Sequence, residues 1–210
     1  MRGPRLFGSA PSGGRSARAR RWIGRRALLL GLLVLLTACA VHAPPAGFVP
    51  PTDTGLVADV PPHEQRFQQC GPAALASVLN YYGDPVTPDD IGQAIYRPGN
   101  LGTLNLDLAL YPRQRGFATR WFDSDLAGLI EAVRRGRPLI VMVDKGLGPV
   151  QMNHFIVVVG YSPDGLTVLS GHAEPRQVDW GSFDAAWAKT NRWTLEVLPG
   201  VLPESENQAE

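Results

Sequence analysis

Hydrophobic residues follow two different spacings along this chain. From about residue 70 to residue 135 they mostly recur every three or four positions, which predicts helices. Beyond residue 137 they form short unbroken runs, which predict buried strands. The clearest helix begins at Cys70, with Pro72 suited to its first turn and Gly83 to its end. Its buried face consists of Ala73, Ala74, Leu75, Val78 and Leu79.

The remaining elements are predicted from local signals. Thr87 and Asp125 are typical N-cap residues, and Gly136 is typical of the end of a helix. Helices are predicted at 87–95, 104–114, 124–135 and 181–189, and strands at 117–122, 138–143, 153–161, 166–170 and 193–198. Helices followed by an antiparallel sheet indicate the α+β class, with N-terminal helices packed on the sheet.

The first 38 residues have the composition of a signal peptide. Residues 1–26 hold eight arginines and no acidic residue, and the apolar run 27–38 is too short to span a bilayer. It ends in Leu-Thr-Ala-Cys at 36–39, which resembles the bacterial lipobox and implies that Cys39 is the acylated first residue. An ordinary secretory signal is the alternative. By the sorting rule of such lipoproteins, Ala40 favours the outer membrane over the inner one, with the protein facing the periplasm. The sequence leaves the Sec and twin-arginine export routes open.

Removal of the signal changes the charge of the protein. Eight of the 20 basic residues and none of the 19 acidic ones lie in residues 1–38, so a chain that starts at Cys39 carries 12 basic and 19 acidic residues, a net charge of −7. Such a chain has no basic surplus to neutralise phosphates, so nucleic-acid binding is not expected.

Composition divides the rest of the chain into three parts. Residues 39–62 hold six prolines and show no helix or strand period, so we expect the lipidated cysteine and an extended tether. Residues 63–200 have globular composition and suffice for one core. Residues 201–210 are predicted to be a flexible tail.

Cys70 and His154 are the candidate catalytic residues. A cysteine at a helix N-terminus is stabilised as a thiolate by backbone N–H groups and the helix dipole. His154 starts an otherwise apolar strand, and a neutral imidazole is the usual base for a thiol. Inert burial of Cys70 and a structural role for His154 are the alternatives. The chain lacks the close-spaced Cys and His pairs of zinc sites, so neither a metal nor another cofactor is expected.

Three sequence blocks resemble the bacteriocin-processing (double-glycine leader) cysteine peptidase family of the papain-like clan, in its stand-alone lipoprotein type. They are CGPAALASVLNYYG from Cys70, the strand PLIVMV, and NHFIVVVGY around His154. The resemblance covers residues 65–198 and implies a papain-like fold, with Cys70 as nucleophile and His154 as base. It also implies that an upstream glutamine completes the oxyanion hole. Gln65 is the best match, one position away from the expected spacing, and Gln68 and Gln69 are the alternatives.

The resemblance is weakest at the third catalytic position, where the family has Asp-Pro after the histidine strand. Ser170 and Gly171 stand there in this chain. If the strand continued, alternation would place Ser170, His172 and Glu174 on one face, so His172 or Glu174 could substitute as the orienting group. A serine holds a tautomer but supplies no charge to stabilise an imidazolium.

The sequence therefore predicts thiol-dependent hydrolysis of a peptide or amide bond by a membrane-anchored periplasmic protein. A papain-like domain that binds peptides or an envelope partner without cleaving them is the alternative, and acyl transfer by the same dyad is a third reading. The substrate and the oligomeric state do not follow from the sequence.

Overall fold

The computed structural model of this protein describes residues 43–65, 69–95, 103–146 and 149–200. The predictions of a signal peptide, a lipidated Cys39 and a tail at 201–210 lie outside these residues, as does Gln68. The described elements are β1 (Gly55–Leu56), α2 (Cys70–Tyr81), α3 (Pro88–Ile95), α4 (Asn105–Gln114), β2 (Phe117–Asp123), α5 (Leu126–Arg134), β3 (Leu139–Asp144), β4 (Asn153–Ser162), β5 (Gly165–Leu169), β6 (Arg176–Asp179), α6 (Trp180–Ala188) and β7 (Trp193–Pro199).

The seven strands of the described part form one antiparallel sheet. Six of them follow the order β2-β7-β3-β4-β5-β6, and β1 pairs with the end of β4. The long hairpin of β3 and β4 lies at the centre, with Val143 opposite His154. Both strands are buried along almost their whole length, which explains their unbroken apolar sequences. The predicted α+β class is therefore confirmed.

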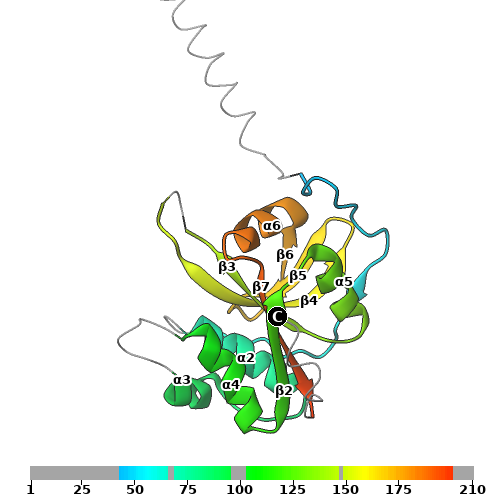
Figure 1. Ribbon diagram of the computed structural model, residues 1–210. Helices are drawn as coiled ribbons and strands as arrows, with labels where there is room; N and C mark the ends of the chain where they lie inside the picture. Colours follow the sequence, from blue (N-terminus) through cyan, green and yellow to red (C-terminus); the bar gives the residue numbers. More distant parts are fainter. Residues whose placement is uncertain (1–42, 66–68, 96–102, 147–148, 201–210) are drawn as a thin grey trace, which may run out of the picture. The chain divides into compact units, whose positions relative to one another are not determined.

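The helices cover the sheet from more than one side. In Figure 1, α2, α3 and α4 lie together in the lower part of the view, beside β2 and below β3 to β6, and α6 lies above the strands. Helix α2 packs on β4 and β3, while α3 and α4 pack on α2. Because α2 carries Cys70 and β4 carries His154, this packing determines where the two candidate residues lie.

Side chains at the helix ends explain where several helices begin. The Asp125 carboxylate accepts a hydrogen bond from the Gly128 N–H at 2.7 Å and starts α5. At α3, Thr87 Oγ1 accepts from the Asp90 N–H at 3.2 Å, and Asp90 Oδ2 accepts from the Thr87 N–H at 3.1 Å. These reciprocal bonds form a capping box and confirm the predicted N-cap.

The segment before α2 is more structured than the sequence predicted. An extended tether with no strand was expected up to residue 62, but residues 55–56 form β1, and the Val57 N–H donates to the Val159 carbonyl at 2.7 Å. Val57 and Val60 are buried in the core, and the Phe48 ring packs on Trp180 with centroids 4.9 Å apart. The tether prediction is therefore wrong for this part, because its few apolar residues find places on the domain.

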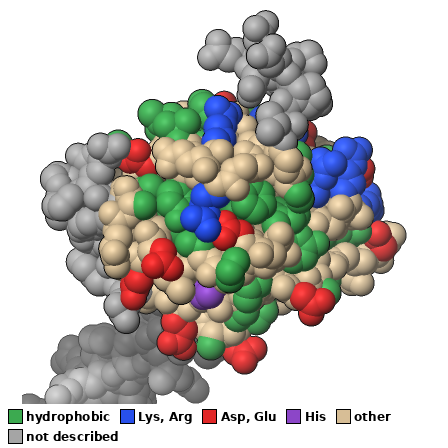
Figure 2. Space-filling view, turned by 90° about the horizontal axis from the view of Figure 1, so that it is seen from below, with side chains coloured by type: hydrophobic (Ala, Val, Ile, Leu, Met, Phe, Trp, Pro, Cys, Tyr) green, Lys and Arg blue, Asp and Glu red, His purple; other side chains and the backbone are tan. Residues whose placement is uncertain are grey.

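Figure 2 shows one face of the molecule, on which acidic, basic and hydrophobic side chains lie interspersed. Several large hydrophobic side chains are exposed in the described part, namely Val49, Leu56, Leu104, Leu106, Leu110, Trp121, Val150 and Met152. Among the residues that the structure describes, no helix has the length and apolar character needed to cross a bilayer.

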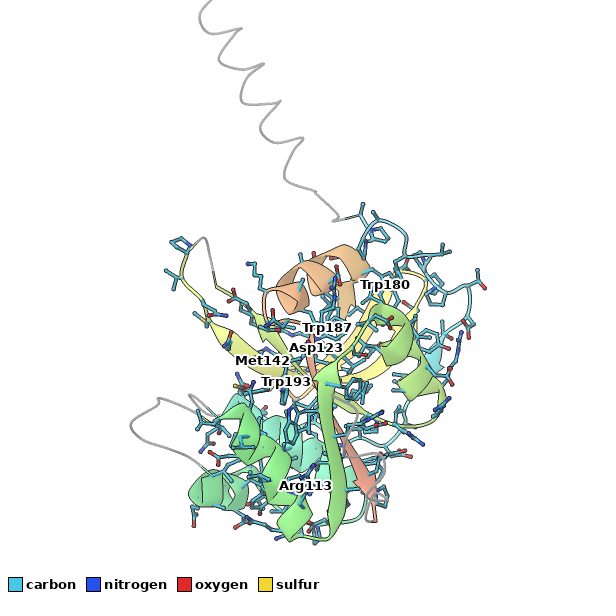
Figure 3. All side chains as sticks on the ribbon, in the orientation of Figure 1. Arg113, Asp123, Met142, Trp180, Trp187 and Trp193 are labelled. Carbon is cyan, nitrogen blue, oxygen red and sulfur yellow. The ribbon has the colours of Figure 1, made fainter. Side chains whose placement is uncertain are left out.

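Tryptophans of α6 and β7 support the centre of the domain. Trp180 and Trp187 are fully buried, and Trp187 lies next to Trp193 (Figure 3), to whose carbonyl its Nε1–H donates at 3.2 Å. The Trp193 ring in turn contacts Phe155 of β4, with centroids 5.6 Å apart. These rings pack against the strand that carries His154.

Candidate active site

Cys70 is the first residue of α2 and is half-buried. The Ala73 N–H bonds the Gln69 carbonyl at 3.0 Å, so the N–H groups of Cys70 and Gly71 precede the first bond of the helix. Because Pro72 has no N–H, the first turn of this helix has one fewer backbone donor without a partner. The Cys70 thiol therefore lies at the positive end of a helix, beside a backbone N–H that is not engaged by the helix.

The start of α2 fits closely against α4. A Cβ added at Gly71 would lie 3.3 Å from the Leu108 side chain and from Thr103 Cβ. A glycine after the cysteine allows this close approach. The packing of Gly71 against α4 therefore helps to fix the position of the neighbouring Cys70.

A small hollow runs along α2 from Cys70. It is lined by His63, Cys70, Ala73, Ala74, Ser77, Phe155, Val157, Leu169 and Gly171. His63 is hydrogen-bonded through Nε2 to Asn80 Oδ1 at 2.7 Å. Because a helix rises 1.5 Å per residue, Asn80 lies about 15 Å along α2 from Cys70. His63 therefore belongs to the far end of the hollow and is not a suitable base for Cys70.

His154 and Ser170 are brought together by the pairing of β4 with the end of β5. His154 Nε2 lies 3.0 Å from Ser170 Oγ, and both residues are buried. Since this contact occupies Nε2, the other ring nitrogen, Nδ1, is the one left for proton transfer. The structure thus pairs His154 with the residue that alignment placed at the orienting position.

The surroundings of His154 disfavour its charged form. Burial is the main cause, and the nearby charges of Lys145 and His172 act in the same direction, so that the pKa of His154 is lowered to about 4. An imidazole in this setting is neutral at physiological pH and able to accept a proton.

Lys145 is a member of the site that the sequence reading missed. Its Nζ donates to Ser170 Oγ at 3.0 Å, so that Lys145, Ser170 and His154 form one chain of hydrogen bonds. Burial is the main cause that lowers the pKa of Lys145, with Cys70 acting against this change and Arg176 in its favour. The sequence signal that could have indicated Lys145 is its position directly after a buried strand, at the start of a glycine-containing loop.

The alternative orienting groups do not have the positions that the sequence analysis gave them. Strand β5 ends at Leu169, Gly171 has a positive φ of 72°, and residues 171–174 are bends. Alternation therefore does not extend to His172 and Glu174, both of which are exposed. The expectation that Ser170, His172 and Glu174 share one strand face is wrong, because the chain turns at Gly171.

Gln65 lies beside the same turn. Its N–H donates to the Gly171 carbonyl at 3.2 Å, and a Cβ at Gly171 would lie 2.4 Å from its side chain. Gly171 lines the same hollow as Cys70, so Gln65 lies beside one wall of that hollow. The Gln69 side chain points elsewhere, since its Nε2 would lie 3.5 Å from a Cβ at Gly92 of α3. Of the candidates in the described part, Gln65 has the more suitable position.

Asp144 fixes the base of the β3–β4 hairpin. Its Oδ1 accepts hydrogen bonds from the N–H groups of Gly146 and Met152, each at 2.8 Å, and these bonds are the main reason that its pKa is lowered.

Among the described residues there is no group of three or more His, Cys, Asp and Glu placed to hold a metal ion.

The family model described as the Peptidase_C39 like family matches residues 57–194. This range contains every described residue that the sequence analysis assigned to catalysis. No curated protein sequence matches the chain.

Solved structures show the same fold. A putative C39-like peptidase from Bacillus anthracis matches with a TM-score of 0.60 and 15% identity, over 70% of this chain and 98% of its own. The peptidase domain of Streptococcus ComA, a bifunctional ABC transporter involved in quorum sensing, matches with a TM-score of 0.56 and 24% identity, over 67% and 98%. A double-glycine-motif protease from an AMS/PCAT transporter, in complex with its leader peptide, matches with a TM-score of 0.57 and 21% identity, over 72% and 99%.

Proposed function

Because this chain belongs to the Peptidase_C39 like family, we propose that it hydrolyses peptide bonds with Cys70 as nucleophile and His154 as general base. The observation that carries the proposal is the contact between His154 Nε2 and Ser170 Oγ at 3.0 Å. It fixes one ring nitrogen and leaves the other free, on a strand that packs against the helix of Cys70.

Cys70 attacks the carbonyl carbon of the scissile bond and forms a thioester as the carbon–nitrogen bond breaks. His154 accepts the proton of the Cys70 thiol and passes it to the leaving nitrogen, which departs as an amine. The neutral imidazole then accepts a proton from the water that hydrolyses the thioester and returns it to the sulfur of Cys70. The Cys70 N–H and the Gln65 side chain are the proposed oxyanion donors, and loss of one such donor costs about 10² to 10³ in rate.

Peptides are the proposed substrate class. One structural neighbour was solved in complex with its leader peptide, which supports a peptide as the substrate of this chain. Exposed hydrophobic side chains of α4 and of the β3–β4 hairpin, such as Leu106 and Met152, offer apolar contacts for such a segment.

Digestion of a defined peptide library, read by mass spectrometry, tests this function. The purified protein should cleave a subset of the peptides, whereas Cys70→Ala should cleave none and His154→Ala should be slower by about 10² or more. Cys70→Ala changes a half-buried residue by one atom and serves as the matched control for folding. Cleavage that persists in Cys70→Ala would assign the activity to another group or to a contaminant.

A second candidate function is peptide binding without cleavage. It is favoured by Ser170, which stands where the family has an orienting carboxylate, and by the cation of Lys145 next to it. Titration of wild type and Cys70→Ala with library peptides separates the two functions. Binding by both proteins without turnover by the wild type would support a binding domain.

The proposed location is the periplasmic face of the outer membrane, reached through acylation of Cys39. The sequence Leu-Thr-Ala-Cys at 36–39 supports this proposal. Metabolic labelling with a fatty-acid analogue should modify the wild type and leave Cys39→Ala unlabelled. Labelling of neither protein would favour an ordinary secretory signal.

A further inference from the structure

Another pocket lies between helix α5 and the strands β2, β7 and β3. Its charged and aromatic lining consists of Arg120, Phe122, Glu131, Arg135, Arg137 and Glu196. The cavity has a volume of about 190 Å³, below the range of roughly 300 to 1,000 Å³ that is typical of sites for drug-sized ligands. A group of about the size of one amino-acid residue therefore suits this pocket.

Glu196 connects the charges of this pocket. Its side chain is only 5% exposed, and it lies on β7 between the buried Leu195 and Val197. Arg120 of β2 donates to its Oε2 at 2.9 Å, and Arg137, which precedes β3, donates to its Oε1 at 3.2 Å. A buried ion pair often adds no net stability over apolar residues of similar volume. The position of Glu196 is therefore better explained by its hold on two guanidiniums at the pocket than by a role in the core.

Both guanidiniums keep donors for a ligand. A guanidinium carries five N–H donors, and in the described part of the chain the side chains of Arg120 and Arg137 each donate one hydrogen bond, to Glu196. The Arg120 guanidinium also lies over the Phe122 ring, 4.5 Å from its centroid. The plane of this guanidinium is thus fixed by two contacts while most of its N–H groups remain available.

The charges that line the pocket leave one positive charge in excess, because three arginines face two glutamates. Arg135 donates to Glu131 at 2.8 Å, but both side chains are about half exposed, so this pair contributes little stability and Arg135 is able to turn to a ligand. A carboxylate balances the excess charge and matches the planar fork of a guanidinium. A doubly charged phosphate would exceed it.

Strand register places this pocket on the other side of the sheet from Cys70. Leu139 lines the pocket and pairs with Val158 of β4, so both side chains point to the same side. Phe155 and Val157, which line the hollow at Cys70, are an odd number of positions from Val158 and point to the opposite side. A ligand in the pocket would therefore leave the hollow at Cys70 open.

We propose that the pocket between α5 and the sheet binds a carboxylate that is carried by a group of about the size of one amino-acid residue. Arg120 and Arg137 bind the carboxylate, and the Phe122 ring contacts the apolar part of the ligand. The C-terminus of a peptide and a free N-acylated amino acid share this chemistry. The inference goes beyond the proposed function and does not depend on it, because Cys70 and His154 take no part in it.

A titration of the protein with N-acetylvaline, followed in ¹H–¹⁵N NMR spectra, tests the inference. The amide signals of Gly128 and Ala132 on α5 should shift saturably, with a Kd in the millimolar range expected for a ligand of about ten non-hydrogen atoms. Those of Ala73 and Ser77, at the Cys70 hollow, should not move. The neutral N-acetylvalinamide should shift none of the four.

A pentapeptide that ends in valine separates the two sources of the carboxylate, and Cys70→Ala is used in this titration to exclude cleavage. Tighter binding of the peptide than of N-acetylvaline assigns the pocket to a peptide C-terminus. Equal or weaker binding assigns it to a free small carboxylate.

Three substitutions test the assigned residues. Arg137→Gln should weaken binding about tenfold or more, since a hydrogen bond to a charged group is lost, and circular dichroism checks its folding. Arg135→Gln, whose partner is exposed, should weaken binding about threefold or more without affecting the fold. Arg134→Gln is the matched control, because this neighbouring arginine of α5 pairs with Asp53 at 3.0 Å and should leave the affinity unchanged.

Several results would overturn the inference. They are the absence of saturable shifts at Gly128 and Ala132, equal binding of N-acetylvalinamide, and an unchanged affinity in both Arg135→Gln and Arg137→Gln. Inorganic phosphate that binds more tightly than N-acetylvaline would overturn the assignment to a carboxylate.

Discussion

Ser170 Oγ lies 3.0 Å from His154 Nε2 and at the same distance from Lys145 Nζ. A hydroxyl thus occupies the place at which a carboxylate would orient and charge-stabilise an imidazolium. The serine can fix the ring of His154 but cannot favour its protonation. This difference leads to the first two predictions.

Removing the hydroxyl should affect catalysis more than stability. Ser170→Ala frees Nε2 and allows the ring to turn, so we expect kcat/KM to fall by about tenfold to a hundredfold. Ser170→Asp supplies the missing charge and should raise the pKa of His154, which an NMR titration of the ring protons measures. An unchanged kcat/KM in Ser170→Ala would show that the contact has no part in the reaction.

The pH dependence of catalysis should reflect the lowered pKa of His154. Because the imidazole stays neutral down to about pH 4, the acid limb of kcat/KM should lie well below the value of about 6.5 of an ordinary histidine. A profile of library-peptide cleavage from pH 3.5 to 9 measures this limb. An acid limb near 6.5 would contradict the electrostatic description of the site.

The same group should make stability depend on pH. Between about pH 4 and 6.5 the unfolded chain binds a proton at His154 that the folded protein excludes, so the free energy of unfolding decreases as pH falls through this window. The loss is on the order of 3 kcal/mol, complete near pH 4. Urea unfolding at pH 7 and pH 5 measures the change in the free energy of unfolding. His154→Gln has no titrating group at this position, so the difference between its change and that of the wild type is the contribution of His154.

Two neighbouring tyrosines offer a matched test of buried hydroxyls. The Tyr81 hydroxyl donates to the Gly136 carbonyl at 2.9 Å, whereas the buried Tyr82 hydroxyl has no partner in the described part, and burial raises its pKa to about 12. Tyr82→Phe should therefore stabilise the protein by about 1 kcal/mol and Tyr81→Phe should destabilise it by a similar amount. Thermal unfolding of both variants measures these changes in stability. Equal effects of the two substitutions would contradict the difference in hydrogen bonding between the two hydroxyls.

The segment before α2 can be tested with two valines. Val57 is 4% exposed and Val49 is 84% exposed. Val57→Ala should cost about 1 to 3 kcal/mol, whereas Val49→Ala should stay within about 0.5 kcal/mol. If both variants unfold like the wild type, the segment is a tether as its proline content predicted.

Sequence patterns were sufficient where an element buries a continuous apolar stretch. Helix α2 and strands β3 and β4 lie near their predicted positions because their apolar residues leave one plausible arrangement. Strands β1 and β6 were missed for the opposite reason. β1 has two residues, and β6 is the short sequence RQVD at the edge of the sheet, with its first two residues exposed. Such strands form because a neighbour offers unpaired backbone groups, and their own sequences carry little signal.

The candidate site was also predictable only in part, namely where a residue has a local sequence signal. Cys70, His154 and Ser170 could be selected as candidates because each has a place in a local sequence block. Glu174 was a wrong alternative, because the positive φ of Gly171 ends the strand alternation. Lys145 was missed because its role depends on contacts with residues 25 positions away in the sequence, which no local pattern records.

Trapping of the acyl-enzyme tests the central claim most directly. The protein and a library peptide that it cleaves are mixed, quenched in acid, and analysed by intact-mass spectrometry with peptide mapping. The account predicts a thioester on Cys70 whose added mass equals the N-terminal fragment of the peptide less one water, and no adduct in Cys70→Ala. Cleavage without any adduct on Cys70, or an adduct on another residue, would contradict it.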